Sequence, residues 1–179
     1  MQIVNTLRLV RHSIRVGILS YKIANRMKLT GIQRRRLLVA GLLHDIGKIK
    51  LNQSILNKKG NLSNEEFEHI KQHVNLGVQI LKKYKIPQSI YNIVKQHHET
   101  PFGTGYPIGL KDDEISIEAK ILRTADVYDA LTSNRSYRKK HSMEEAIEIM
   151  KRENIYGLIN YMINQKDIDR IRKLKNLIS

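Results

Sequence analysis

Apolar residues recur every three or four positions along almost the whole chain, and no run of alternating apolar and polar residues is long enough to build a sheet. In a helix this spacing gathers the apolar side chains on one face, so the pattern predicts an all-α fold, a compact bundle of about seven helices. The 179 residues suit one domain over 1–179, and the sequence shows no repeat, linker or separate regulatory domain.

Residues that cap or break helices divide this bundle into expected elements. A first helix should end near Met27, others should cover 35–44, 63–83, 87–98, 116–131 and 155–177, and one more should start at Ser142. Gly47 is expected as a C-terminal cap, Pro87 in a first turn, and Ser63 and Ser142 in capping boxes. Residues 50–60 and 101–110 read as loops. The periodic apolar residues are Ile3, Leu7, Val10, Ile14, Ile18 and Ile23 in the first helix, and Phe67, Ile70, Val74, Gly77, Val78 and Leu81 in the helix over 63–83.

The composition limits the kinds of site that the chain can build. It has no cysteine, so any metal ion must bind to histidine, aspartate or glutamate, which points to iron, manganese or other ions that accept nitrogen and oxygen ligands. No stretch resembles a signal peptide or a membrane-spanning helix, so we expect a cytoplasmic protein without membrane insertion.

The charge is strongly basic, with 32 Lys and Arg against 17 Asp and Glu, a formal net charge of +15. This excess favours an anionic partner, such as a nucleotide, a nucleic acid or a membrane surface. Solvated helix faces explain it equally well, because the basic residues are spread along the chain. Nucleic-acid binding is not expected, since no recognised motif supports it and only 6% of residues are aromatic.

Two doublets carry the strongest chemical signal: His44-Asp45, just before Gly47, and His97-His98, just before Pro101. Adjacent side chains reach one site most easily where a helix ends. The two oxygens of Asp45 could bridge two ions about 3.5–4 Å apart, the separation used in two-metal hydrolysis. The doublets therefore predict a metal site, and the Gly103–Pro107 turn beside it reads as a phosphate-binding loop.

Three further residues are ambiguous when taken alone. His12 and His73 could be ordinary half-buried residues of amphipathic helices. Asp126 lies among Ile, Leu and Val, where a buried carboxylate needs a metal or an ion-pair partner. Arg123 or Arg135 could supply that ion pair, so the structural alternative stays open.

Together these residues match the motifs of one known family. The matching segments are His12-Ser13-x-Arg15-Val16, His44-Asp45-Ile46-Gly47-Lys48, Ser54-Ile55-Leu56-Asn57-Lys58 with Leu62 and Glu66, His73, His97-His98-Glu99, Gly103-x-Gly105-Tyr106-Pro107, Ala125-Asp126-x-x-Asp129-Ala130-Leu131-Thr132-Ser133 and Arg135-x-Tyr137-Arg138. Across nearly its whole length the chain resembles an HD-GYP domain, the hydrolase branch of the HD superfamily that degrades cyclic di-GMP.

The resemblance implies a helical bundle of the HD-domain type and a metal-dependent phosphodiesterase. One divalent ion would be held by His12, His44, Asp45 and Asp126, and Asp45 would bridge to a second ion held by His73, His97 and His98. Lys48 would approach the scissile phosphate, Gly103, Gly105 and Tyr106 would shape the nucleotide pocket, and Arg135 and Arg138 would hold phosphate or guanine. A water activated between the two ions would cut cyclic di-GMP to pGpG, and a second cut would give GMP.

The chain also departs from the family pattern. Thr100 replaces the usual Arg, Phe102 the usual Asp, and Ser136 a common Pro. Arg8 stands where some members bind a third metal through Glu, and because a cation cannot ligate a metal, two ions are expected. The departures at Thr100, Phe102 and Arg8 motivate one alternative, a catalytically weak cyclic di-GMP receptor that signals through a protein partner. A second alternative is an HD-type phosphohydrolase for another nucleotide, against which the Gly103–Pro107 loop argues. The sequence defines neither the metal nor the oligomeric state.

Overall fold

The computed structural model describes residues 2–58, 60–133, 140–153, 155 and 158, and these residues form the all-α fold that the sequence predicts. Within them lie seven α-helices of eight residues or more and no β-strand, apart from an isolated bridge between Phe102 and Lys111. The longer helices are α1 (Gln2–Arg26), α2 (Gly31–Leu43), α4 (Asn64–Lys71), α5 (His73–Lys83), α6 (Gln88–Gln96), α7 (Ile117–Thr132) and α8 (Met143–Arg152). The short elements are α3 (Gln53–Leu56) and two 3₁₀ helices, η1 (Ile46–Lys50) and η2 (Asp112–Glu114).

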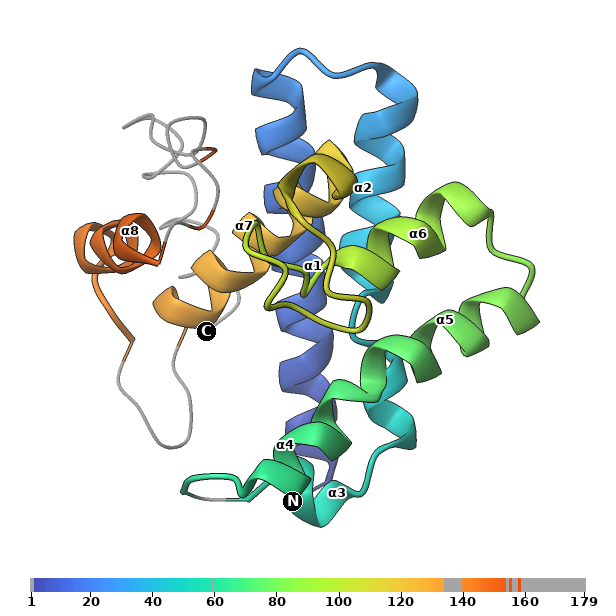
Figure 1. Cartoon of the computed structure of the whole chain (residues 1–179), viewed down its shortest axis with the longest axis vertical. Helices are drawn as coiled ribbons and strands as arrows, with labels where there is room; N and C mark the ends of the chain where they lie inside the picture. Colours follow the sequence, from blue (N-terminus) through green and yellow to red (C-terminus); the bar gives the residue numbers. More distant parts are fainter. Residues whose placement is uncertain (1, 59, 134–139, 154, 156–157, 159–179) are drawn as a thin grey trace.

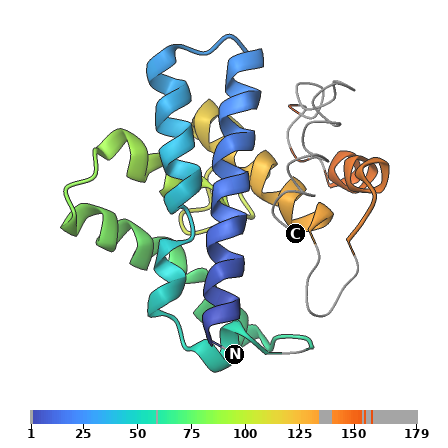
Figure 2. The same cartoon turned by 180° about the vertical axis from the view of Figure 1, so that it is seen from behind.

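α1 runs side by side with α2 (Figures 1 and 2). α7 packs against α1 and carries α8, while α6 packs against α2 and α5. The centre of the core is formed by residues that are at most 1% exposed: Val16, Ile23, Leu37, Val94, Ile121, Leu122 and Met150. No helix of the described residues is long and apolar enough to cross a membrane.

The small residues of α1 face the core, and several of its large apolar residues are exposed to solvent. Ser13, Gly17, Ser20 and Ala24 are buried, whereas the exposed fractions of Leu7, Val10, Ile14 and Ile18 are 37–53%. The close approach of α2 explains this orientation, because a Cβ on Gly41 would lie 2.5 Å from the Gly17 Cα. Helical spacing located α1 correctly but did not show which of its faces is buried.

The helix starts follow local hydrogen bonding. The capping boxes at Ser63 and Ser142 are confirmed, and Thr30 forms a third with Gln33. α2 therefore begins at Gly31, earlier than predicted. Pro87 is the N-cap of α6 rather than a residue of its first turn.

The helix expected over 63–83 divides at Gln72 into α4 and α5. Gln72 keeps helical angles, φ −60° and ψ −20°, and its N–H donates to the carbonyls of His69 and Ile70. The apolar spacing continues through this turn, so the pattern does not predict it. Phe67 of α4 is 45% exposed, whereas Val74 and Leu81 of α5 are buried.

Gly47 is not a helix cap, contrary to the sequence prediction. α2 ends at Leu43 with His44 as its C-cap, and Gly47 lies inside η1. A Cβ on Gly47 would lie 1.9 Å from the carbonyl oxygen of His73 and 2.6 Å from the Gly77 nitrogen. The absent side chain therefore lets η1 lie directly on α5, which brings Asp45 beside His73.

The last predicted helix, over 155–177, lies outside the described residues except for Ile155 and Leu158, which are both buried.

Candidate metal centre

The structure brings all seven predicted metal ligands to one place. They come from α1, the end of α2, the start of η1 and of α5, the end of α6, and α7. Three groups have ligand atoms within 4.8 Å of one another: His12, His44 and Asp126; His44, Asp45 and His97; and His73, His97 and His98. Side chains that are up to 114 residues apart in the sequence, from His12 to Asp126, thus share one cluster.

Three of the imidazoles are oriented by their own helices. The Nδ1–H groups of His44, His73 and His97 donate to the carbonyls three residues earlier, at 2.8, 2.7 and 2.5 Å. Each ring then directs a bare Nε2 into the cluster. These three Nε2 atoms and Oδ1 of Asp45 are buried and have no hydrogen-bond partner among the described residues. Buried polar atoms are rarely left unpaired, and bare Nε2 atoms of this kind fit divalent metal ions.

Asp45 faces both halves of the cluster. Its Oδ2 lies 3.4 Å from Nε2 of His44 and 3.8 Å from Nε2 of His12, while its Oδ1 lies 3.5 Å from Nε2 of His73. One carboxylate oxygen therefore serves each side, which is the arrangement that a bridging ligand requires.

His12 is oriented by a side chain that the sequence analysis left without a role. Its Nδ1–H donates to Oδ2 of Asp129 at 2.7 Å, and Arg15 binds both oxygens of the same carboxylate at 2.6 and 2.9 Å. Asp129 lies three residues after Asp126, a spacing that places both on one face of a helix and could have revealed the pair. This carboxylate fixes the ring so that Nε2 of His12 points to Asp126, 3.1 Å away.

Asp126 takes its ion-pair partners from the cluster. Within the described residues these partners are His12 and His44, rather than Arg123. The other structural alternative, Arg135, lies outside the described residues, as do the proposed substrate ligand Arg138 and the departure at Ser136.

The electrostatics favour the neutral form of His73, His97 and His98 and the ionised form of Asp45 and Asp126. Burial lowers the pKa of His97 to about 3, with help from His44 and His73, and burial also lowers the pKa values of His73 and His98. Burial alone would raise the pKa of Asp45, but Lys48 and His44 hold that pKa well below its usual range. Neutral imidazoles and ionised carboxylates are the forms that bind metals.

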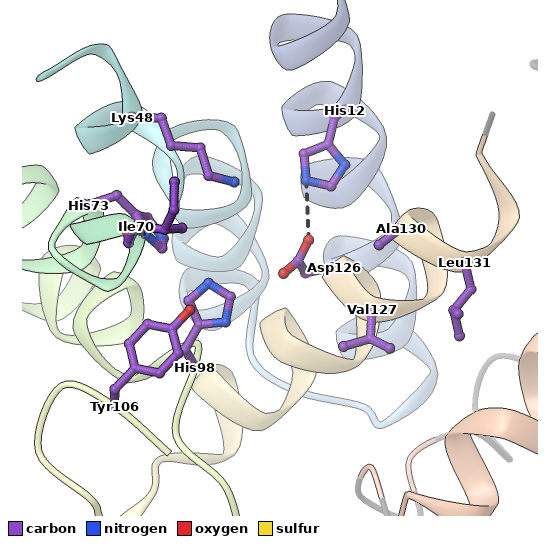
Figure 3. Close-up of a pocket in the computed structure, with 10 residues that line it drawn as sticks. All are labelled: His12, Lys48, Ile70, His73, His98, Tyr106, Asp126, Val127, Ala130 and Leu131. Atoms are coloured by element: carbon purple, nitrogen blue, oxygen red, sulfur yellow. Dashed lines mark hydrogen bonds and ion pairs between the residues drawn. The ribbon is translucent and has the colours of Figure 1, made fainter. Parts of the chain in front are cut away.

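The cluster opens into a cavity of about 350 Å³. It is lined by His12, Lys48, Ile70, His73, His98, Tyr106, Asp126, Val127, Ala130 and Leu131, and Figure 3 shows Lys48 and Tyr106 on one side of the open space, with His12 and Asp126 facing them. The Lys48 ammonium lies 2.5 Å from Oδ2 of Asp45. Lys48 is 24% exposed, so a positive charge borders the cavity beside the cluster.

Most N–H groups of the expected phosphate-binding loop, Gly103–Pro107, have acceptors within the protein: those of Gly103 and Thr104 donate to Thr100, and that of Tyr106 donates to the carbonyl of His98. Phosphate binding by this loop stays a prediction. The amides that follow it, of Ile108, Gly109 and Leu110, donate to the carboxylate of Glu99 at 2.8, 3.0 and 2.9 Å. Glu99 is fully buried, and sequence reasoning gave it no role.

Tight packing brings Tyr106 of this loop onto the cluster. A Cβ on Gly105 would lie 2.4 Å from the Cα of Glu99, so the loop can lie this close only with glycine there. The Tyr106 ring stacks on His98, with 4.7 Å between centroids. Gly103, with φ +71°, supplies the turn.

The departures from the family pattern lie around this loop and on α1. The Thr100 hydroxyl accepts a hydrogen bond from the Thr104 amide at 3.1 Å, and Phe102 is 65% exposed. Arg8 lies on an exposed part of α1.

Comparisons with known proteins agree with this geometry. The HD domain family matches residues 3–156. A cyclic di-GMP phosphodiesterase of Thermotoga maritima is 44% identical over 138 residues, which cover 76% of the chain and 38% of that protein. A 3′3′-cGAMP-specific phosphodiesterase of Vibrio cholerae is 38% identical over 149 residues, which cover 83% of the chain and 32% of that protein. The chain thus spans about a third of the length of these curated relatives.

Solved structures share the fold. An HDG"Y"P protein of Bdellovibrio bacteriovorus superposes with a TM-score of 0.69 at 26% identity, over 86% of the chain and 51% of that protein's chain. The HD domain of the phosphodiesterase PgpH of L. monocytogenes, in complex with cyclic di-AMP, gives a TM-score of 0.61 at 18% identity, over 86% and 84% of the two chains. The chain belongs to the HD domain family, and its resemblance to the HD-GYP branch is confirmed.

Proposed function

We propose that this domain is a metal-dependent phosphodiesterase that hydrolyses cyclic di-GMP. The observation that carries the proposal is the set of bare, buried Nε2 atoms around Asp45, because no structural role explains several inward-facing acceptors without donors. The relatives named as cyclic di-GMP phosphodiesterases support the substrate.

The residues that would hold two divalent cations divide into two sets that share Asp45. His12, His44 and Asp126 would form one set, and His73, His97 and His98 the other. Iron and manganese suit this mixture of imidazole and carboxylate ligands. When bound, a pair of such cations supplies an activated water and neutralises charge on the phosphoryl oxygens.

The protein's own side chains would bind and position the substrate. Lys48 lies beside Asp45 on the cavity wall, where its ammonium can donate to a phosphate oxygen and stabilise the charge that develops during cleavage. Tyr106, held by its stacking on His98, would place the sugar and base next to the cluster. Arg135 and Arg138 remain proposed contacts to phosphate or guanine.

The test combines metal analysis of anaerobically purified protein with chromatography of cyclic di-GMP digests in Mn²⁺ or Fe²⁺. We expect pGpG as the first product. Asp45→Ala should lower both metal content and turnover by orders of magnitude, because the shared carboxylate is lost. Asp113→Ala, which removes an exposed carboxylate, is the matched control. An Asp45→Ala variant with full metal content and activity would refute the assignment, and binding without product would favour the receptor alternative.

A second substrate, 3′3′-cGAMP, has its own support, since a relative that is 38% identical is named as specific for it. A panel of cyclic di-GMP, 3′3′-cGAMP and cyclic di-AMP, compared by kcat/KM, decides between them. If only mononucleotides or short RNA were cleaved, a different HD-type phosphohydrolase would be indicated.

A further inference from the structure

The edge of the cavity carries an exposed aromatic ring that nothing in the proposed chemistry uses. Phe67 of α4 was expected on the buried face of its helix, but 45% of it is exposed. Its ring meets Tyr106 edge to face, with centroids 6.5 Å apart and an interplanar angle of 83°. Tyr106 lines the cavity, so this ring contact joins Phe67 to the cavity wall.

A cation lies in the angle between the two rings. The Lys71 ammonium is 4.9 Å from the centroid of Phe67 and 5.6 Å from that of Tyr106. Phe67 and Lys71 are four residues apart on α4, so they share one helix face. Lys71 also forms an ion pair with Glu68 at 2.6 Å, and Glu68 is itself 67% exposed. Solvent screens such a pair strongly, so it competes weakly with a ligand for Lys71.

The distances from the cluster match the layout of a nucleotide. The centroid of Tyr106 is 4.7 Å from that of His98 and 6.4 Å from that of His73, and the centroid of Phe67 is 6.5 Å from that of Tyr106. A phosphate at the cluster would therefore put its attached sugar near Tyr106 and its base near Phe67. An aromatic ring stacks on any base, while an ammonium donates to the acceptors O6 and N7 that guanine presents together.

We propose that Phe67 and Lys71 form a nucleobase subsite at the rim of the cavity, with Phe67 stacking on a purine and Lys71 favouring guanine over adenine. This inference rests on the proposed function for its substrate, because it assumes that a nucleotide phosphate sits at the metal cluster. Adenine carries a donor, N6, where guanine carries the acceptor O6, so a cation discriminates between them.

The experiment measures equilibrium binding to the Mn²⁺-loaded protein by calorimetry, with GMP, AMP and ribose 5-phosphate as probes. GMP and ribose 5-phosphate present the same phosphate to the cluster, so the ratio of their affinities reports the base alone. A stacked base should make GMP bind about 5- to 150-fold more tightly than ribose 5-phosphate. Phe67→Ala should lower this ratio by most of that factor, with the affinity for ribose 5-phosphate unchanged, and Phe67→Tyr should preserve it.

Two further variants sharpen the result. Lys71→Met should lower the preference for GMP over AMP while leaving AMP binding largely intact. Tyr84→Ala removes a ring that is 71% exposed at the far end of α5 and should change none of the ratios. Thermal unfolding of each variant checks that the fold is retained.

The outcomes separate the two proposals. The subsite is overturned if Phe67→Ala keeps the wild-type ratio of GMP to ribose 5-phosphate affinity. It is also overturned if the wild type binds GMP no more tightly than ribose 5-phosphate. A wild type that prefers GMP through Phe67 but releases no product from cyclic di-GMP keeps the subsite and refutes the phosphodiesterase.

Discussion

Replacing Glu99 tests how far the loop beside the cluster depends on one buried carboxylate. Its Oε1 accepts the Ile108 amide at 2.8 Å, and its Oε2 accepts the amides of Gly109 and Leu110 at 3.0 and 2.9 Å. Glutamine has the same size but only one acceptor oxygen. In Glu99→Gln, therefore, at least one of the three N–H groups must face the side-chain NH₂ and lose its acceptor.

The magnitude follows from the cost of a buried donor without a partner, about 1–3 kcal/mol. Glu99→Gln should lower the free energy of unfolding by about 2 kcal/mol, since one bond is lost and the others lose their charge assistance. For a protein of this size, that loss corresponds to a fall in Tm of about 4–8 °C. Glu99→Ala removes both acceptor oxygens and so all three hydrogen bonds, and it should cost roughly twice as much.

The assay is thermal unfolding, followed by circular dichroism at 222 nm, of protein treated with a chelator so that metal binding does not contribute. Glu114→Gln is the matched control, because this exposed carboxylate accepts one amide, that of Lys111, at 2.8 Å. The control should change stability by less than about 0.5 kcal/mol. A Glu99→Gln protein that unfolds at the wild-type temperature would show that the carboxylate does not hold the loop.

Three other perturbations have definite expected results. Gly47→Ala should lower both the Tm and the metal affinity, because its Cβ would lie 1.9 Å from the His73 carbonyl oxygen. Gly31→Ala is the control and should change neither quantity, because the nearest atoms to its Cβ are 3.8 Å away. Thermal unfolding and Mn²⁺ titration of the two variants measure both quantities. Burial lowers the pKa of His12, but hydrogen bonds to Asp126 and Asp129 outweigh it and raise that pKa to about 9. The metal-free protein should therefore be most stabilised by His12 below the unfolded pKa of 6.5, and urea unfolding should show a loss of about 3 kcal/mol as pH rises to 9, a slope that His12→Asn removes. Adding Mn²⁺ at about 100 times its Kd should stabilise the metal-free protein by about 2.7 kcal/mol for each ion bound, and no shift in Tm would argue against a metal site.

Local signals predicted much of the helical framework. Ser63 and Ser142 start helices because each forms a capping box with a glutamate three residues later, and such bonds are readable from neighbouring residues. The doublets His44-Asp45 and His97-His98 also fall at or beside helix ends, as predicted, where adjacent side chains can reach a common site. The assignment of the individual side chains as ligands stays a prediction.

Features that depend on contacts between distant segments could not be predicted from the sequence. Gly47 looks like a helix cap until the carbonyl of His73 is seen against it, and Phe67 follows the apolar period of a helix that in fact turns at Gln72. Glu99 resembles any charged residue after a helix, because its three amide partners come from a loop without regular spacing. These are consequences of tertiary packing, which no local pattern encodes.

Because His44, His73 and His97 are each tied to a carbonyl three positions earlier, the tilt of every ring is set within a single turn of its own backbone. A substitution elsewhere can displace one helix relative to another without rotating these imidazole rings or changing which nitrogen carries the proton. Damage to this centre should therefore show up as altered spacing between the ligand atoms rather than as misdirected donors. The ligand cluster can therefore tolerate substitutions of the surrounding residues as long as the helices keep their separation.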